Sequence, residues 1–164
     1  MDLEGYRFSR DDFSRLLLRR YMPERTDGES AVILAFLAKH LDEFDSITFA
    51  KRVGTGIVPN PEHPDAVQRN TVFSSNLKID ILAFRGARPI IIECKQRVTP
   101  ASLGQIRTYR YFLTKEFPDA PEPELLVVGR EATPDALEAL QAEGVTVYLY
   151  PEAIVARDAQ GERV

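Results

Sequence analysis

The chain has 164 residues, of which 44% are hydrophobic and 28% are charged, so it can bury a sizeable core within one domain. Its formal net charge of −4 argues against a protein held on nucleic acid by bulk electrostatics, although an enzyme that visits nucleic acid needs only a local basic surface. No apolar run approaches the ~20 residues that span a bilayer, and the start lacks the basic and apolar segments of a secretory signal, so we expect a cytoplasmic protein without a membrane contact.

Two helices are predicted ahead of the first strand. One covers residues 9–21, with Ser9 as its N-cap. Its apolar positions recur at helical spacing: Phe13, Leu16, Leu17 and Tyr21. The other covers about 28–42, where either Thr26 or Asp27 can be the N-cap. Its apolar stripe consists of Val32, Ile33, Phe36, Leu37 and Leu41.

The middle of the chain is predicted to contain three strands and one long loop. Residues 46–53 alternate between apolar and polar as a strand does. The segment 54–75 is rich in glycine, proline and asparagine, and we expect it to be irregular. A loop of this length inside a compact domain is usually functional or mobile. Two further strands follow, over about 76–84 and 89–95.

Helices and strands alternate in the last third of the chain. Thr99 and Pro100 are predicted to start a helix that ends near residue 116. The remaining elements are a strand over 124–129, a helix that starts at Thr133 and Pro134 and stops at Gly144, and a strand over 145–150. This order predicts an α/β fold with a mixed central sheet and helices on both faces, followed by a polar tail that we expect to fray.

The hairpin formed by the second and third strands brings three charged side chains together. With a turn centred on residues 86–87, Asp80 lies opposite Glu93, and strand alternation puts Lys95 on the same face as Glu93. Opposed residues in an antiparallel pair are roughly 4.5–5.5 Å apart at Cβ, so two bare carboxylates there repel each other. A divalent cation would compensate for this repulsion. We therefore predict a metal site made by Asp80, Glu93 and the backbone carbonyl of Cys94.

The residues around Glu93 indicate a buried strand. The run Ile90–Ile92 precedes it, and charged groups in such a place are costly unless they are paired or bound to metal. This argues against the alternative in which Glu93 and Lys95 form a solvent-facing ion pair. Cys94 is the only cysteine, which excludes an intrachain disulfide and fits a reducing compartment. We expect its side chain to be a small buried hydrophobe rather than a nucleophile.

These groups suit the hydrolysis of a phosphodiester bond. The reaction requires an activated water, neutralised charge on the phosphoryl oxygens and a stabilised leaving oxygen, and carboxylate-bound divalent cations supply much of this. Magnesium prefers oxygen ligands and often takes only one or two protein carboxylates. We therefore expect Mg²⁺ or Mn²⁺ as the cofactor. Lys95 would lie beside it, where it can orient or help deprotonate the attacking water.

The motif Asp-x(12)-Glu-x-Lys, formed here by Asp80, Glu93 and Lys95, resembles that of the PD-(D/E)XK nuclease superfamily. The helix after it carries Gln105 and Tyr109 on one face, which is similar to the RecB-type branch with its QxxxY motif. The resemblance implies that the acids bind metal, that the lysine is catalytic, and that the glutamine and tyrosine contact the phosphate or position the water. The implied activity is a Mg²⁺-dependent nuclease acting on DNA.

The resemblance covers about residues 26–150 and implies a restriction-endonuclease-like αβββαβ core. Residues 1–25 would then be an N-terminal helical extension and 155–164 a polar tail. Families of this group often carry a further acid on the helix before the sheet, and Glu29 is in that place. The chain departs from the family name at Ile79, where a proline would precede the first aspartate.

Local basic groups are candidates for contacts with phosphate. Lys78, Arg97 and Arg107 are the ones we expect to contact nucleic acid. We interpret most of the others as ordinary solvated charges: Arg15, Arg19, Arg20, Arg25, Lys51, Arg52, Arg69 and Arg110.

Alternatives remain open for the site and for the function. Glu29 can be only a partner of the helix dipole, and Gln105 and Tyr109 can be plain helix-surface packing. The chain can be a catalytically inactive nuclease-fold module that binds nucleic acid or a partner protein. It can also be a different metal-dependent hydrolase that acts on RNA or a nucleotide. A homodimer would allow both strands of a duplex to be cut.

Overall fold

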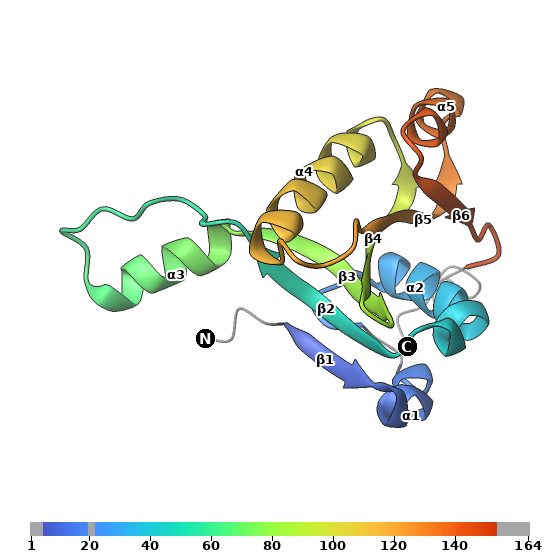
Figure 1. The fold of residues 1–164 in the computed structure, drawn as a ribbon, viewed down its shortest axis with the longest axis horizontal. Coiled ribbons are helices and arrows are strands. Elements are labelled where there is room, and N and C mark those ends of the chain that lie inside the picture. The colour runs from blue at the N-terminus through green and yellow to red at the C-terminus, as the bar shows by residue number, and fades with distance from the viewer. Residues whose placement is uncertain (1–4, 20–21, 154–164) are drawn as a thin grey trace, which may run out of the picture.

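The computed structural model describes residues 5–19 and 22–153. Its centre is a six-stranded sheet whose strands follow chain order from β1 at one edge to β6 at the other (Figure 1). Neighbouring strands from β1 to β4 are antiparallel, whereas β4, β5 and β6 run parallel, so the sheet is mixed. The strands are β1 (Tyr6–Ser9), β2 (Ser46–Val53), β3 (Leu77–Arg85), β4 (Arg88–Val98), β5 (Glu124–Ala132) and β6 (Thr146–Leu149).

Helices cover both faces of this sheet. The helices are α1 (Phe13–Leu17), α2 (Asp27–His40), α3 (Asp65–Ser75), α4 (Ala101–Glu116) and α5 (Pro134–Ala142). α1 and α2 share one buried apolar cluster with the sheet, and α4 and α5 share another with its opposite face (Figure 1). Apart from α3, which is inserted between β2 and β3, the order α2-β2-β3-β4-α4-β5 is the expected αβββαβ core, so the predicted fold class is confirmed. Within the described ranges, no helix is both long and apolar enough to cross a membrane.

Local sequence signals account for the two elements that frame the site. α2 starts at the N-cap Thr26, and all five residues of its predicted apolar stripe are buried. The β3–β4 hairpin turns at residues 86–87, between the paired Arg85 and Arg88. Gly86 has φ +57°, a left-handed conformation that glycine adopts without steric cost and that suits the first position of a two-residue hairpin turn.

The prediction of a helix over residues 9–21 was wrong at its N-terminal side. Residues Tyr6–Ser9 form β1, which pairs antiparallel with β2, and Ser9 then leads into a 3-10 turn over Arg10–Asp12. Only α1 is α-helical here. A four-residue edge strand that is largely exposed carries too little alternation to be recognised. Arg20, Tyr21 and the predicted tail after residue 155 lie outside the described residues.

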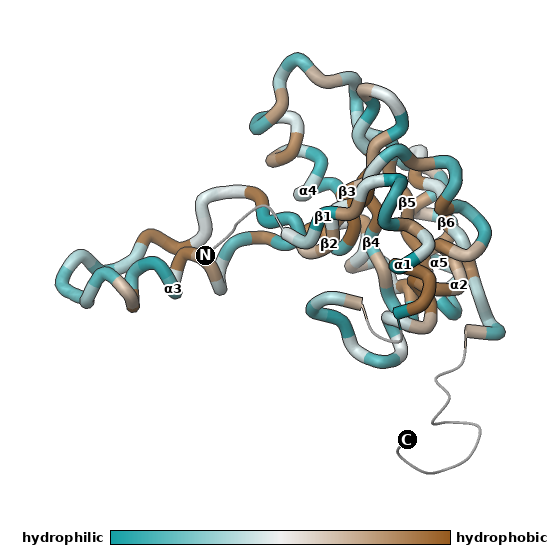
Figure 2. Tube along the Cα trace, turned by 90° about the horizontal axis from the view of Figure 1, so that it is seen from below, coloured by the Kyte–Doolittle hydropathy of each residue, from teal (hydrophilic) through white to brown (hydrophobic). Residues whose placement is uncertain are grey.

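The prediction that 54–75 is entirely irregular was also wrong. Its second half is α3, which follows Pro64 and projects with its connecting loop away from the rest of the protein (Figures 1 and 2). No residue of α3 is buried, so the helix has no apolar stripe from which it could be recognised. The start of α4 also differs slightly from the prediction. Its N-cap is Pro100, and the Thr99 hydroxyl accepts no hydrogen bond from the first turn of the helix.

Candidate active site

The carboxylates predicted to form the site lie close together at one end of the sheet. Asp80 is the fourth residue of β3, and Glu93 and Lys95 lie in the middle part of the antiparallel β4. Glu93 is completely buried and Asp80 is only 3% exposed. The Nζ atom of Lys95 is 2.5 Å from Oε1 of Glu93, so these two side chains share a face as predicted.

Both oxygens of Asp80 are engaged. Oδ2 accepts a hydrogen bond of 2.8 Å from the backbone N–H of Cys94 on the neighbouring strand. Oδ1 is 2.7 Å from Nη1 of Arg25, and the exposed fractions of the two side chains are 5% and 7%. Asp80 is therefore held between the edge of β4 and a buried guanidinium.

Glu93 lacks the partners that a buried carboxylate normally has. Among the described residues, neither of its oxygens has a partner in hydrogen-bonding geometry, although the Lys95 ammonium is an ion-pair partner of Oε1. Burial and, after it, the nearby Asp80 charge raise its pKa to about 8, against the opposing effect of Lys95. Glu93 is thus a buried carboxylate whose charged form is poorly stabilised.

A buried carboxylate without hydrogen bonds fits a divalent cation. Two carboxylates and a backbone carbonyl are oxygen donors of the kind that Mg²⁺ and Mn²⁺ bind, and Mg²⁺ commonly takes only one or two protein carboxylates. The described residues contain no cluster of three or more histidine, cysteine, aspartate or glutamate side chains arranged to hold a metal. The protein would therefore supply Asp80, Glu93 and the Cys94 carbonyl, and solvent or substrate the rest.

Lys95 is a cation in this environment. Burial alone lowers its pKa, but the charge of Glu93, with smaller contributions from Asp80 and Glu29, outweighs burial and raises the pKa. Its side chain is 29% exposed, so it links the buried carboxylates to the surface. As an ammonium group it can attract a phosphate oxygen or orient a water, whereas it cannot accept a proton.

Glu29 closes a capping box at the start of α2. Its Oε2 accepts from the backbone N–H of Thr26 at 3.1 Å and from the Thr26 hydroxyl at 2.9 Å. The spacing Thr-x-x-Glu in the sequence is itself a signal for such a capping box. The charge of Glu29 still influences Lys95 and Cys94, so the carboxylate is near the site. A role as a metal ligand remains a prediction and requires the side chain to leave Thr26.

The side chain of Cys94 is buried in the cluster beneath α2, on the opposite face from Glu93. Burial raises the pKa of its thiol well above the usual value, and the charges of Asp80 and Glu93 raise it further. Such a thiol stays protonated and is a poor nucleophile, in agreement with the sequence interpretation.

Gln105 and Tyr109 lie on the side of α4 that faces Glu93. Tyr109 is 6% exposed and belongs to the cluster between α4 and the sheet. Burial raises the pKa of its hydroxyl, Glu93 and then Asp80 raise it further, and a hydrogen bond with Gln105 opposes them. α4 therefore brings Tyr109 within electrostatic reach of the carboxylates, and Gln105 contacts Tyr109.

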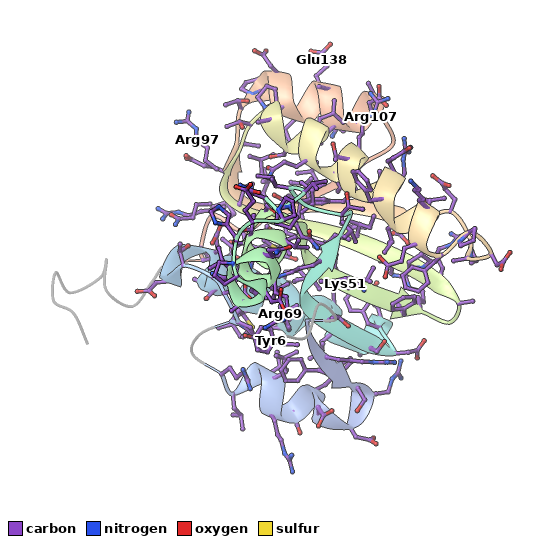
Figure 3. All side chains as sticks on the ribbon, turned by 90° about the vertical axis from the view of Figure 1, so that its left-hand side faces the viewer. Tyr6, Lys51, Arg69, Arg97, Arg107 and Glu138 are labelled. Carbon is purple, nitrogen blue, oxygen red and sulfur yellow. The ribbon has the colours of Figure 1, made fainter. Side chains whose placement is uncertain are left out.

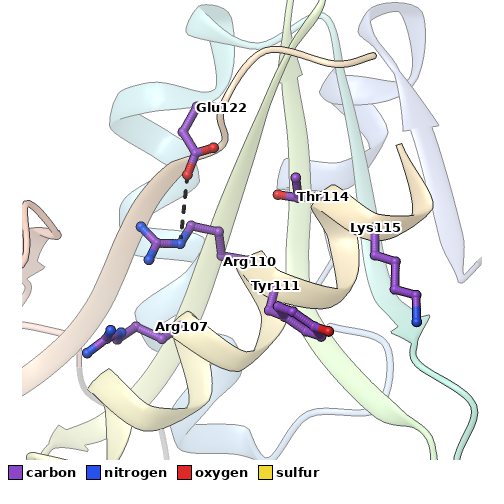
Figure 4. A pocket seen from close by; sticks show the side chains of 6 residues that line it. All are labelled: Arg107, Arg110, Tyr111, Thr114, Lys115 and Glu122. Atoms are coloured by element: carbon purple, nitrogen blue, oxygen red, sulfur yellow. Dashed lines mark ion pairs between the residues drawn. The ribbon is translucent and has the colours of Figure 1, made fainter. Parts of the chain in front are cut away.

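The three predicted phosphate contacts are not gathered into one surface. Lys78 is 2.9 Å from Oε2 of Glu24. Arg97 and Arg107 lie at separate places in Figure 3; their exposed fractions are 67% and 52%, and each has an acidic neighbour no closer than 3.5 Å. Arg107 contributes to a surface pocket of about 610 Å³ on the outer side of α4, which Figure 4 shows with its lining residues: Arg107, Arg110, Tyr111, Thr114, Lys115 and Glu122.

Arg25 is the site residue that sequence reasoning missed. The sequence predicts a solvated charge here, whereas the side chain of Arg25 is only 7% exposed and pairs with Asp80. It lies in a turn between helices, where no periodicity marks a buried position. Only the packing of this turn against β3 reveals its role.

Two solved structures are similar to this chain, both at low sequence identity. No family model and no curated protein matches the chain. A solved structure of a repair endonuclease from Pyrococcus abyssi is similar over 79% of this chain and 49% of its own, with a TM-score of 0.46 and 15% identity. The EndoMS–dsDNA2 complex is similar over 80% and 48%, with a TM-score of 0.45 and 14% identity. The chain thus spans about half the length of these two proteins, and similarity this low assigns no activity to it.

Proposed function

We propose that the chain is a metal-dependent nuclease that hydrolyses phosphodiester bonds in DNA. The observation that carries this proposal is the buried pair of carboxylates, Asp80 and Glu93, with the Lys95 ammonium 2.5 Å from Glu93 and no hydrogen bond to either Glu93 oxygen. A protein without use for a cation would gain little from burying this arrangement, since each uncompensated charge is costly. The choice of DNA rests on the resemblance of the motif to PD-(D/E)XK nucleases.

Asp80, Glu93 and the Cys94 carbonyl would hold Mg²⁺ or Mn²⁺, which when bound neutralises charge on the phosphate and lowers the pKa of a bound water. Lys95 would orient the attacking water and attract a phosphate oxygen, because its ammonium group is the partly exposed cation beside the carboxylates. Gln105 and Tyr109 would position the water or the phosphate from α4. Glu29 would assist once released from Thr26.

Contacts farther from the reacting phosphate are proposed for Arg97, Arg107 and Lys78. Arg97 and Arg107 are exposed and form only long, solvent-exposed ion pairs, so phosphate can replace their acidic partners. Lys78 would have to leave Glu24 first. Cutting both strands of a duplex would require a second copy of the chain or a second binding event.

Cleavage assays test the proposal directly. Wild-type protein is incubated with single-stranded DNA, duplex DNA or RNA in Mn²⁺, Mg²⁺ or EDTA, beside Asp80→Asn and Lys95→Ala. Asp119→Asn, which removes an exposed acid, is the matched control. We expect cleavage of DNA by the wild type and the control only with metal, and at least a hundredfold slower cleavage by the other two variants. Equal cleavage by all four proteins would remove Asp80 and Lys95 from the mechanism.

One observation favours the inactive nuclease-fold module instead. Arg25 already neutralises Asp80, so the fold can keep this carboxylate buried without any metal. A module of this kind would bind DNA or a partner protein but would not bind Mn²⁺ at millimolar concentration. Calorimetric titration with Mn²⁺ therefore separates the two candidates without a substrate.

A further inference from the structure

The guanidinium of Arg25 is buried and has more hydrogen-bond donors than it has acceptors around it. Nη1 pairs with Oδ1 of Asp80 at 2.7 Å, but Nε and Nη2 are buried and have no hydrogen-bond partner. Buried side-chain donors nearly always have partners, so a guanidinium left in this state needs a reason. Its one strong contact is with a carboxylate of the candidate site.

The turn that carries Arg25 is held in place by its neighbours. Glu24 has φ +55°, a left-handed conformation that is unfavourable for a residue other than glycine. Its carboxylate is 2.9 Å from Nζ of Lys78 on β3 and 3.5 Å from Nη2 of Arg52 on β2. Directly before the turn, the backbone N–H of the buried Met22 donates to Ser30. These contacts keep the turn in a strained conformation that directs Arg25 to Asp80.

The charges of the cluster balance without a metal. Asp80 and Glu93 are the carboxylates, and Arg25 and Lys95 are the cations that contact them. A divalent cation bound to both carboxylates would add two positive charges beside a buried guanidinium, where like charges repel strongly. A bound metal would therefore weaken the contact of Arg25 with Asp80.

We infer that Arg25 is the counter-cation of the metal-free site and that it competes with the divalent metal for Asp80. Metal binding then requires the guanidinium to leave Asp80, and the strained turn at Glu24 is the segment that moves with it. Arg25 acts on the site through Asp80, so it is a positioning residue rather than a catalytic one. The inference rests on the proposed metal site, but it concerns metal affinity and not cleavage.

Calorimetric titration of the full chain with Mn²⁺, without nucleic acid, tests this competition. Arg25→Met keeps a long apolar side chain but removes the charge, and Arg25→Lys keeps the charge but loses the planar guanidinium. Arg88→Met is the matched control, since Arg88 is exposed at the other end of β4. We expect the Met variant to bind Mn²⁺ at least tenfold more tightly than the wild type, the Lys variant to be intermediate, and the control to be unchanged. Equal affinity of the wild type and the Met variant would overturn the inference.

A second measurement on the wild type covers the case in which Arg25→Met does not fold. The Nε–H resonance of Arg25 is followed by NMR while Mg²⁺ is added. We expect it to shift with the same concentration dependence as the heat of binding, because the guanidinium leaves Asp80. Binding of Mg²⁺ with no change in this resonance would refute the competition.

The outcomes also separate this inference from the proposed function. A tenfold difference in Mn²⁺ affinity together with no cleavage of any substrate would leave the role of Arg25 standing and remove the nuclease activity. Metal-dependent cleavage together with equal Mn²⁺ affinities of the wild type and the Met variant would remove the role of Arg25 and leave the nuclease activity standing. No Mn²⁺ binding by either protein would overturn the competition and the metal requirement together.

Discussion

Replacing Glu93 by glutamine tests the burial of this carboxylate through the pH dependence of stability. The pKa of Glu93 is raised from 4.5 to about 8, so between these values the folded protein keeps a proton that the unfolded chain has lost. Without metal, stability should therefore fall as pH rises through this window and level off above about 8. At about 1.4 kcal/mol per pKa unit, the loss attributable to Glu93 is about 5 kcal/mol. An amide does not ionise, so Glu93→Gln should lack this loss.

The assay is urea unfolding in EDTA at several pH values from 5 to 9. We expect the free energy of unfolding of the wild type to decline with pH relative to that of Glu93→Gln, so that the variant is the more stable of the two at pH 9. Added Mg²⁺ should restore much of the loss in the wild type and little in the variant, because a ligand that binds only the folded state stabilises it. Glu138→Gln, at an exposed position of α5, serves as the control. Parallel stability curves for the wild type and Glu93→Gln would refute the reasoning.

Three further changes test the fold around the site, each by urea unfolding. Phe36→Ala should cost about 3–5 kcal/mol, because the ring is 1% exposed and contacts His40 and Phe44 beneath the sheet. Thr26→Ala should cost about 1 kcal/mol, since it removes the N-cap of α2 and frees Glu29. Joining Val53 to Leu77 through Asn-Gly in place of residues 54–76 should cost less than about 2 kcal/mol, because no residue of α3 is buried, its main contact is Phe73 on Arg52, and Val53 and Leu77 are already paired.

For each of these three predictions, one result would contradict it. A loss below about 1 kcal/mol for Phe36→Ala would mean that α2 does not pack on the sheet as described. No loss for Thr26→Ala would argue against the capping box. A protein that fails to fold without residues 54–76 would show that the projecting segment contributes to the core.

The sequence determined the hairpin and its chemistry. Gly86 sets the turn, the turn sets the register, and the register places Asp80 beside Glu93 and Lys95. The run of isoleucines before Glu93 correctly indicated a strand buried on both faces, since all three are fully buried. These features were predictable because they depend on residues close to one another in the chain, through alternation and turn geometry.

Elements with little burial could not be recognised in this way. β1 is a short exposed edge strand, and α3 has no buried residue, so neither carries the hydrophobic periodicity by which strands and helices are predicted. Glu29 is an intermediate case, because its capping box was written in the sequence as Thr-x-x-Glu but the same residue also suited a metal ligand.

Only the tertiary structure decided which cation holds Asp80. Arg25 lies in a turn that follows no repeat, and it reaches Asp80 because α2 packs against β4 and β5 while Glu24 ties the turn to β2 and β3. Periodicity reports which face of an element is buried, whereas an ion pair between distant segments depends on how whole elements pack. The chain itself therefore specified the two acids and the lysine, and the packing of the fold specified the arginine that meets them.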